Sequence, residues 1–336
     1  MLGLAALVVV GVPQAALAAT PGFAISASKP MLGVRAVSMA AAPTGARVAL
    51  GMEDNSIRII DAATRQTLKV LQGHTRPVQA IAWSPDGTRI ASGDERAKIF
   101  LWNTKSWTKT GEIVGHTRQI QFLDFNSASN QLVSTGQDDV VKVWDLKDTK
   151  KERINLPGGG ANYYGARFIG KTNDLGIATL QQGSRLYTAA KTMRGWLTAH
   201  GGQGALSIDF NAPATRALSA GRDNAAALFD MKTMRRMGSF KGHGDWVVSA
   251  IFSPNGKWVV TSSSDRSVKI WNPNTFQAVA TIEEQKAVGS PLVFTADGKY
   301  LLTVDISDNV VVHAMKPAQA GVAAPVKKTT KKRRGG

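Results

Sequence analysis

The sequence lacks cysteine and is short of acidic residues. With no cysteine among 336 residues, disulfides, cysteine nucleophiles, thiolate metal sites and a lipid-modified cysteine are excluded. Asp and Glu number 24 against 41 Lys and Arg, so the formal net charge is +17. Such a surface attracts polyanions such as nucleic acid or acidic proteins. Ordinary solubility is the simpler explanation of the same charge.

The sequence also lacks the common catalytic motifs. There is no His-Glu-x-x-His and no Gly-x-Ser-x-Gly, the patterns of zinc proteases and serine hydrolases. Gly165 to Thr172 has the spacing of a phosphate-binding loop, but turn residues follow it where that loop needs a helix. We therefore predict a non-catalytic protein with no cofactor, no metal and no small-molecule substrate.

The first nineteen residues contain no charged side chain. Their apolar run ends at Val12, and small residues follow up to Ala19, which is typical of a secretory signal peptide over residues 1–19. The first lysine is Lys29, so the usual basic start of such a peptide is missing. We expect a bacterial protein exported to the periplasm or secreted. A membrane anchor and a cytoplasmic chain are the alternatives.

The C-terminal segment is basic and of low complexity. Residues 316–336 are rich in Ala, Pro and Lys, which predicts a disordered tail. Its clustered cations suit phosphate-bearing polymers or membrane surfaces. They are Lys327, Lys328, Lys331, Lys332, Arg333 and Arg334. Since these six account for part of the +17, the rest of the chain still carries +11.

Residues 20–315 repeat with a period of about 42 residues. One phrase of alternating apolar and polar residues, which predicts a half-buried strand, ends near Trp102 and again near Trp144. Continuing this spacing in both directions gives seven evenly spaced marks. They are Ile60, Trp102, Trp144, Tyr187, Phe229, Trp271 and His313.

Two further sequence motifs recur together with the seven marks. A small residue followed by histidine precedes four of them, at His74, His116, His200 and His243. Tight-turn sequences recur between the strands, as in residues 84–87 and 253–256. Each unit is therefore predicted to contain four strands, and such units bury their faces only against one another.

These phrases and their spacing resemble the WD40-repeat family from about residue 33 to residue 315. The resemblance implies an all-β, seven-bladed propeller of four-stranded antiparallel blades. The last unit ends after its third strand, so we expect residues 22–28 to supply the strand that closes the ring and leaves no open edge.

In that family the histidine belongs to a buried hydrogen-bonded tetrad of His, Ser or Thr, Asp and Trp. The resemblance implies structural tetrads in the sixth, third, fifth and second units. They are His243, Thr261, Asp265 and Trp271; His116, Ser134, Asp138 and Trp144; His200, Ser219 and Asp223, with Phe229 in place of Trp; and His74, Ser92 and Trp102. In the second unit Arg96 stands where the carboxylate is expected.

Residues beside the tetrads lie on one rim of the disc in that family. Here the rim carries five arginines and one tryptophan, an arrangement suited to docking a partner. They are Arg76, Arg96, Arg118, Arg222, Arg266 and Trp246, and Glu95 stands among them. The irregular fourth unit, with Tyr163 and Tyr164, is a second candidate.

From these features we predict a monomeric protein-interaction scaffold that presents an arginine-rich rim to an unknown protein partner. The alternative is a polyanion-binding module that uses the rim and the basic tail to hold nucleic acid, lipopolysaccharide or an acidic polymer. Scattered, solvated arginines remain the simpler explanation of the rim.

Overall fold

The computed structural model describes residues 23–31, 35–158, 160–181, 183–286 and 291–317. The expected signal peptide over residues 1–19 and the six cations of the basic tail lie outside the described residues. No helix in the described part of the chain is long and apolar enough to cross a membrane.

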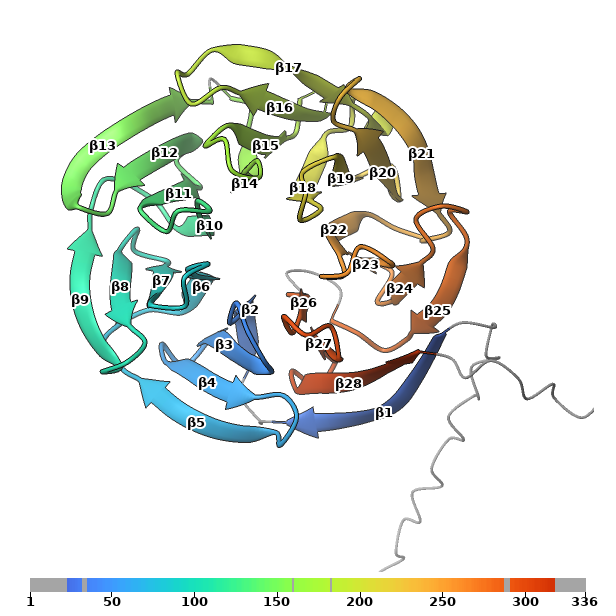
Figure 1. The fold of residues 1–336 in the computed structure, drawn as a ribbon, viewed down its shortest axis with the longest axis horizontal. Helices are drawn as coiled ribbons and strands as arrows, with labels where there is room; N and C mark the ends of the chain where they lie inside the picture. The colour runs from blue at the N-terminus through green and yellow to red at the C-terminus, as the bar shows by residue number, and fades with distance from the viewer. Residues whose placement is uncertain (1–22, 32–34, 159, 182, 287–290, 318–336) are drawn as a thin grey trace, which may run out of the picture.

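The described strands form seven four-stranded sheets arranged around a ring (Figure 1). Blades 1 to 3 contain β2 (Ala36–Ala41), β3 (Arg47–Met52), β4 (Ile57–Asp61) and β5 (Gln66–Leu71); β6 (Val78–Trp83), β7 (Arg89–Asp94), β8 (Ile99–Asn103) and β9 (Thr108–Ile113); β10 (Ile120–Phe125), β11 (Gln131–Gly136), β12 (Val140–Asp145) and β13 (Asp148–Pro157). Blades 4 to 6 contain β14 (Tyr163–Phe168), β15 (Leu175–Thr179), β16 (Gly183–Tyr187) and β17 (Met193–Thr198); β18 (Ala205–Phe210), β19 (Arg216–Gly221), β20 (Ala225–Asp230) and β21 (Arg235–Lys241); β22 (Val247–Phe252), β23 (Val259–Ser263), β24 (Val268–Trp271) and β25 (Ala278–Ile282).

The all-β, seven-bladed prediction is confirmed. All seven predicted marks fall on the third strand of a blade, from Ile60 in β4 to His313 in β28. Within each blade the strands are antiparallel, and in blades 1 to 6 they lie side by side in chain order from the centre of the ring outward (Figure 1). The regular spacing therefore places one mark in each blade.

Blade 7 combines strands from both ends of the chain. It contains β26 (Val293–Phe294), β27 (Tyr300–Val304), β28 (Val310–Pro317) and β1 (Phe23–Met31). β1 pairs antiparallel with β28, from Phe23 opposite Pro317 to Met31 opposite Val310. The N-terminal strand thus occupies the outermost position that β5 occupies in blade 1 (Figure 1).

The apolar core lies between the blades. Seven buried clusters occur in the described chain, and each combines residues of two adjacent blades. The tetrad tryptophans pack against the small residue before each histidine. A Cβ on Gly115 would lie 2.5 Å from the ring of Trp144, so the glycine of the Gly-His phrase leaves room for the indole.

The common topology gives the ring two distinct faces. Because the strands alternate in direction, the loop that enters each blade and the turn between its second and third strands lie at the same end. We call this end the histidine face. In blades 2, 3, 5 and 6 it consists of residues 72–77 and 95–98, 114–119 and 137–139, 199–204 and 222–224, and 242–246 and 264–267.

Candidate functional site

The sixth blade contains a buried chain of hydrogen bonds. Trp271 Nε1 donates to Thr261 Oγ1 at 2.8 Å, and this hydroxyl lies 2.7 Å from His243 Nε2. His243 Nδ1 lies 2.9 Å from a carboxylate oxygen of Asp265. Since a carboxylate only accepts, Nδ1 carries the proton and Nε2 accepts from the threonine.

The environment keeps this histidine neutral. Burial lowers the pKa of the His243 imidazole, and the Asp265 carboxylate offsets only part of that effect. Burial alone would raise the pKa of Asp265, but hydrogen bonds from Gly244, Ser267 and His243 outweigh it and lower that pKa to about 2. The pair therefore consists of a neutral imidazole and an ionised carboxylate.

Blades 3 and 5 repeat this arrangement. In blade 3, His116 lies 3.0 Å from Asp138 and 2.7 Å from Ser134, which accepts from Trp144 Nε1 at 2.8 Å. In blade 5, His200 lies 2.7 Å from Asp223 and 2.8 Å from Ser219. Phe229 takes the place of the tryptophan and has no donor.

Blade 2 corrects the expectation that its carboxylate is missing. His74 Nδ1 lies 2.9 Å from Asp94 Oδ2, and His74 Nε2 lies 2.7 Å from Ser92, which accepts from Trp102 at 2.8 Å. Asp94 stands two residues before Arg96 and its other oxygen accepts the backbone N–H of Arg96 and Lys98. The carboxylate thus reaches the imidazole from the end of β7 instead of from the turn.

Asp94→Asn is expected to lower the free energy of unfolding by about 2 kcal/mol, because an amide nitrogen placed against His74 leaves a buried donor without an acceptor. Arg96→Ala is the control. Its side chain is exposed, so we expect a change within about 0.5 kcal/mol. Urea unfolding measures both, and equal losses for the two variants would contradict the assignment of Asp94.

These tetrads contain serine, histidine and aspartate, yet they offer no nucleophile to solvent. Ser92, Ser134, Ser219 and Thr261 are all fully buried. In blades 2, 3 and 6 the hydroxyl holds both the indole and the imidazole. Their role is to fix the blade geometry, as buried, fully paired polar networks do.

Blade 7 uses a histidine in place of the tryptophan. His313 Nε2 lies 2.9 Å from Thr303 Oγ1, the contact that the indole nitrogen makes in blade 6. Burial lowers the pKa of His313 to about 4. The last blade therefore contains a neutral, buried imidazole on β28, opposite Ser28 of β1.

Acid is expected to destabilise the protein through His313. Its pKa is near 6.5 in the unfolded chain and lower in the folded one, so the unfolded state binds more protons in this interval and stability falls as the pH falls through it. Between about pH 7 and pH 5 the loss is about 2 kcal/mol.

The variant His313→Gln keeps a donor for Thr303 but does not titrate. Its unfolding free energy, measured by urea titration across the same pH range, is expected to fall by about 2 kcal/mol less than that of the wild-type protein. An identical pH dependence in both proteins would contradict the role of His313.

Blade 4 contains an aromatic and arginine cluster. Arg185 donates to the Tyr163 hydroxyl at 3.2 Å and to Gln181 at 3.0 Å. Its guanidinium carbon lies 4.9 Å from the centre of a Trp196 ring. Burial raises the pKa of the Tyr163 phenol to about 12. The Tyr163 ring is buried, whereas Tyr164 is half-buried.

A second charged cluster, which the sequence did not indicate, lies on the innermost strands. Arg167 Nε is 3.2 Å from Asp209, and its Nη1 is 3.8 Å from Asp124. Burial raises the pKa of Asp124 to about 6, although Arg167 opposes this. Each carboxylate also accepts a backbone N–H from the next blade, Phe168 on Asp124 and Phe252 on Asp209, so the cluster joins adjacent blades.

The five predicted rim arginines all lie on the histidine face. They are Arg76 and Arg118 in the loops that enter blades 2 and 3, and Arg96, Arg222 and Arg266 in the turns of blades 2, 5 and 6. Among the described residues, no carboxylate lies within ion-pair distance of any of them. Elsewhere, Arg58, Arg153 and Arg194 are paired with aspartates.

The tetrad carboxylates of this face are engaged elsewhere, which explains why the rim arginines lack ion-pair partners. Asp94, Asp138, Asp223 and Asp265 are directed to the tetrad histidines. These four acidic groups are therefore turned into the blades. Glu95 and Asp245 are exposed on the same face, but its exposed charge is still positive, because the exposed cations outnumber them. These cations are Arg76, Arg96, Lys98, Arg118 and Arg266.

Trp246 is the large exposed aromatic of this face, with 43% of its surface accessible. The guanidinium carbon of Arg222 lies 4.4 Å from the centre of its ring. The pair bridges blades 5 and 6, because Arg222 follows β19 and Trp246 precedes β22. Cation–π stacking of this kind holds both side chains in place.

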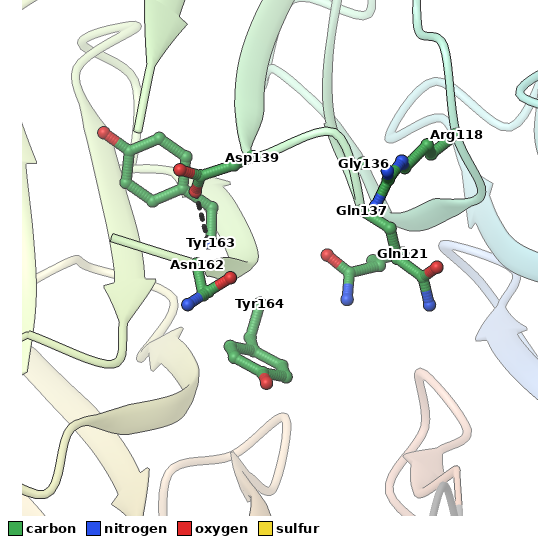
Figure 2. A pocket seen from close by; sticks show the side chains of 8 residues that line it. All are labelled: Arg118, Gln121, Gly136, Gln137, Asp139, Asn162, Tyr163 and Tyr164. Atoms are coloured by element: carbon green, nitrogen blue, oxygen red, sulfur yellow. Dashed lines mark hydrogen bonds between the residues drawn. The ribbon is translucent and has the colours of Figure 1, made fainter. Parts of the chain in front are cut away.

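Blades 3 and 4 enclose a pocket of about 220 Å³ on the histidine face (Figure 2). It is lined by Arg118, Gln121, Gly136, Gln137, Asp139, Asn162, Tyr163 and Tyr164. The predicted rim and the irregular fourth blade were separate candidates in the sequence, and the structure brings them together here. The described residues contain no group of three or more His, Asp or Glu side chains that could hold a metal.

Comparison with known proteins identifies the repeats. Residues 65–103, 107–145 and 234–272 match the family model described as "WD domain, G-beta repeat". Each segment runs from the outermost strand of one blade to the third strand of the next, and these are the segments that hold the tetrads of blades 2, 3 and 6. The chain therefore carries WD40 repeats within a seven-bladed propeller.

Similarity to curated proteins is partial. The chain is 31% identical over 102 residues to pre-mRNA-processing factor 19 of Mus musculus, covering 30% of this chain and 20% of that protein. It is 36% identical over 44 residues to transcriptional repressor tup12 of Schizosaccharomyces pombe, covering 13% of this chain and 7% of that protein. The match thus spans a fifth or less of these relatives, and both come from eukaryotes.

Proposed function

We propose that this WD40-repeat propeller is a non-catalytic interaction scaffold whose histidine face docks an acidic protein partner. The observation that carries the proposal is the division of charge on that face. Its tetrad carboxylates are paired with histidines inside the blades. The five arginines form no ion pair in the described part of the chain, and they outnumber the exposed carboxylates of the face, Glu95 and Asp245.

The exposed tryptophan supports a protein partner. Arg and Trp are enriched among the residues that contribute most to protein–protein binding, and Trp246 stands beside Arg222 on this face. Its exposed indole offers apolar contact area for side chains of a protein partner.

The second candidate is a polyanion-binding module, which the net charge of +17 favours. In this case nucleic acid or another acidic polymer is held by the arginines and by the basic tail. Binding of this kind weakens steeply as salt rises, because each phosphate contact releases counterions.

Titration with two labelled probes tests these candidates. Fluorescence anisotropy is measured with an oligo-glutamate peptide and with oligothymidylate, using the full chain and a chain without residues 325–336. The scaffold predicts tighter binding of the peptide, retained without the tail. Tighter binding of oligothymidylate, lost with the tail, would instead establish the polyanion module.

Export from a bacterial cell is a separate proposal, and it rests on the composition of residues 1–19. Mass spectrometry of the mature N-terminus tests it. Cleavage near Ala19 is expected, and an intact Met1 would contradict a cleaved signal peptide.

A further inference from the structure

The pocket between blades 3 and 4 has the size of one amino-acid side chain. Its volume of about 220 Å³ corresponds to roughly seven water molecules, at about 30 Å³ each. Sites for cofactors and other small molecules usually measure about 300–1,000 Å³. The pocket therefore suits a single residue of a partner chain better than a nucleotide or a cofactor.

The polar groups of the pocket are divided between two ends. Arg118 stands at one end, beside Gln137, and Asp139 and Asn162 stand at the other (Figure 2). Arg118 is exposed and has no carboxylate within ion-pair distance in the described chain. Its guanidinium is therefore available to a carboxylate that enters the pocket.

The acidic end is already occupied by the protein's own backbone. Asp139 accepts the N–H of Gly160 at 2.7 Å and the N–H of Tyr163 at 3.3 Å. These bonds hold the loop that enters blade 4 against the turn of blade 3. Each oxygen of Asp139 thereby accepts one backbone N–H, so this carboxylate helps to fix the wall of the pocket.

Amide side chains provide both donors and acceptors between the two ends. The amide nitrogen of Gln121, in the orientation that satisfies its neighbours, donates to the carbonyl oxygens of Tyr163 at 2.7 Å and Gly136 at 3.3 Å. Its oxygen then remains as an acceptor, and Gln137 and Asn162 add two further amides to the lining of the pocket. Such a mixture matches the N–H and C=O groups of a peptide, whereas a phosphate needs donors alone.

We propose that this pocket binds one aspartate or glutamate side chain of an acidic peptide segment, with Arg118 pairing the carboxylate and Gln121, Gln137 and Asn162 pairing the adjacent peptide groups. Tyr164 supplies the apolar surface for the methylene part of that side chain, since its half-buried ring lines the pocket. The inference rests on the proposed function and identifies the residue type that the scaffold recognises.

Competition binding tests the inference. The labelled oligo-glutamate peptide is displaced by an unlabelled peptide of alanine and serine that contains a single glutamate, and by the same peptide with glutamine instead. For the wild-type protein we expect the glutamate peptide to compete about tenfold better, which corresponds to about 1.4 kcal/mol. For Arg118→Gln the two peptides should compete equally.

Two variants of Tyr164 separate this contact from the general positive charge of the face. Tyr164→Phe keeps the ring, so its affinity for the glutamate peptide should equal that of the wild type. Tyr164→Ala should lose about tenfold, although neither substitution changes the charge. A thermal melt verifies that each variant is folded. Arg47→Gln, exposed on β3 away from the histidine face, serves as a charge-removing control and should bind the glutamate peptide like the wild type.

Each outcome decides one of the two proposals. If Arg118→Gln still prefers glutamate over glutamine, or if Tyr164→Ala binds like the wild type, the pocket is not the recognition site. The docking face itself still stands if oligo-glutamate binds and rim substitutions weaken it. If oligo-glutamate does not bind at all, the proposed function fails, and the pocket proposal fails with it.

Discussion

Thr261→Val is expected to lower the free energy of unfolding by about 3 kcal/mol. Valine has the shape of threonine, so the packing of blade 6 is kept. The change removes the hydroxyl that accepts from Trp271 and donates to His243. Two buried polar groups then lack a partner, and each costs about 1–3 kcal/mol.

Thr135→Val is the matched control. Thr135 is also fully buried in a second strand, but its hydroxyl oxygen has no hydrogen-bond partner in the described structure. Its replacement should leave the free energy of unfolding unchanged or raise it by up to about 1 kcal/mol. Urea unfolding followed by tryptophan fluorescence measures both variants. If both variants lose the same free energy of unfolding, the hydrogen bonds of the tetrad add nothing to the stability that burial of the side chain provides.

Removal of three arginines from the histidine face is expected to weaken binding of oligo-glutamate by about a hundredfold. The variant is Arg76→Gln, Arg96→Gln and Arg266→Gln, all exposed and all outside the pocket. Each lost ion pair is worth about 1 kcal/mol, and about 2.7 kcal/mol together corresponds to that factor. Anisotropy titration at fixed salt gives the ratio.

A second triple variant removes the same charge elsewhere. Arg47, Arg235 and Arg236 are exposed and lie on β3 and β21, away from the histidine face. Their replacement by glutamine should change the affinity by less than about threefold, because the probe would meet these charges only through screened, long-range attraction. If both triple variants lose affinity equally, net charge and not the histidine face governs binding.

The repeat spacing predicted the number of blades, and the resemblance to the WD40-repeat family predicted the propeller. Strands of a propeller pack only against their neighbours, so the residues that a blade needs recur at fixed intervals along the chain. The distance from Trp102 to Trp144 defines the interval. Counting by this interval located His313, which has an imidazole where other blades have an indole. The structure places His313 within hydrogen-bond distance of Thr303. The position of one side chain in each blade is therefore encoded locally.

Contacts that depend on the path of a turn could not be predicted from the repeat spacing. Asp94 was missed because counting back from Trp102 leads to Arg96, whereas the carboxylate approaches His74 from the end of β7. In blade 3 the same role falls to Asp138, which lies in the turn itself. Residue spacing does not distinguish these two routes to one imidazole.

Contacts between blades were also beyond sequence analysis. Arg118 and Tyr164 are separated by a whole blade in the sequence and line one pocket in the structure. The Arg167 contacts with Asp124 and Asp209 likewise join three blades. Only the closed ring determines which loops meet, since each blade taken alone presents the same set of loops.

Site-specific photo-crosslinking tests the docking face most directly. A photoreactive amino acid is placed at Thr75, which is exposed in the loop that enters blade 2, or at Thr44, which is exposed at the opposite end of blade 1. With labelled oligo-glutamate as the probe, we predict crosslinks from position 75 and background alone from position 44. Equal crosslinking from both positions, or a preference for position 44, would contradict the claim that the histidine face binds acidic partners.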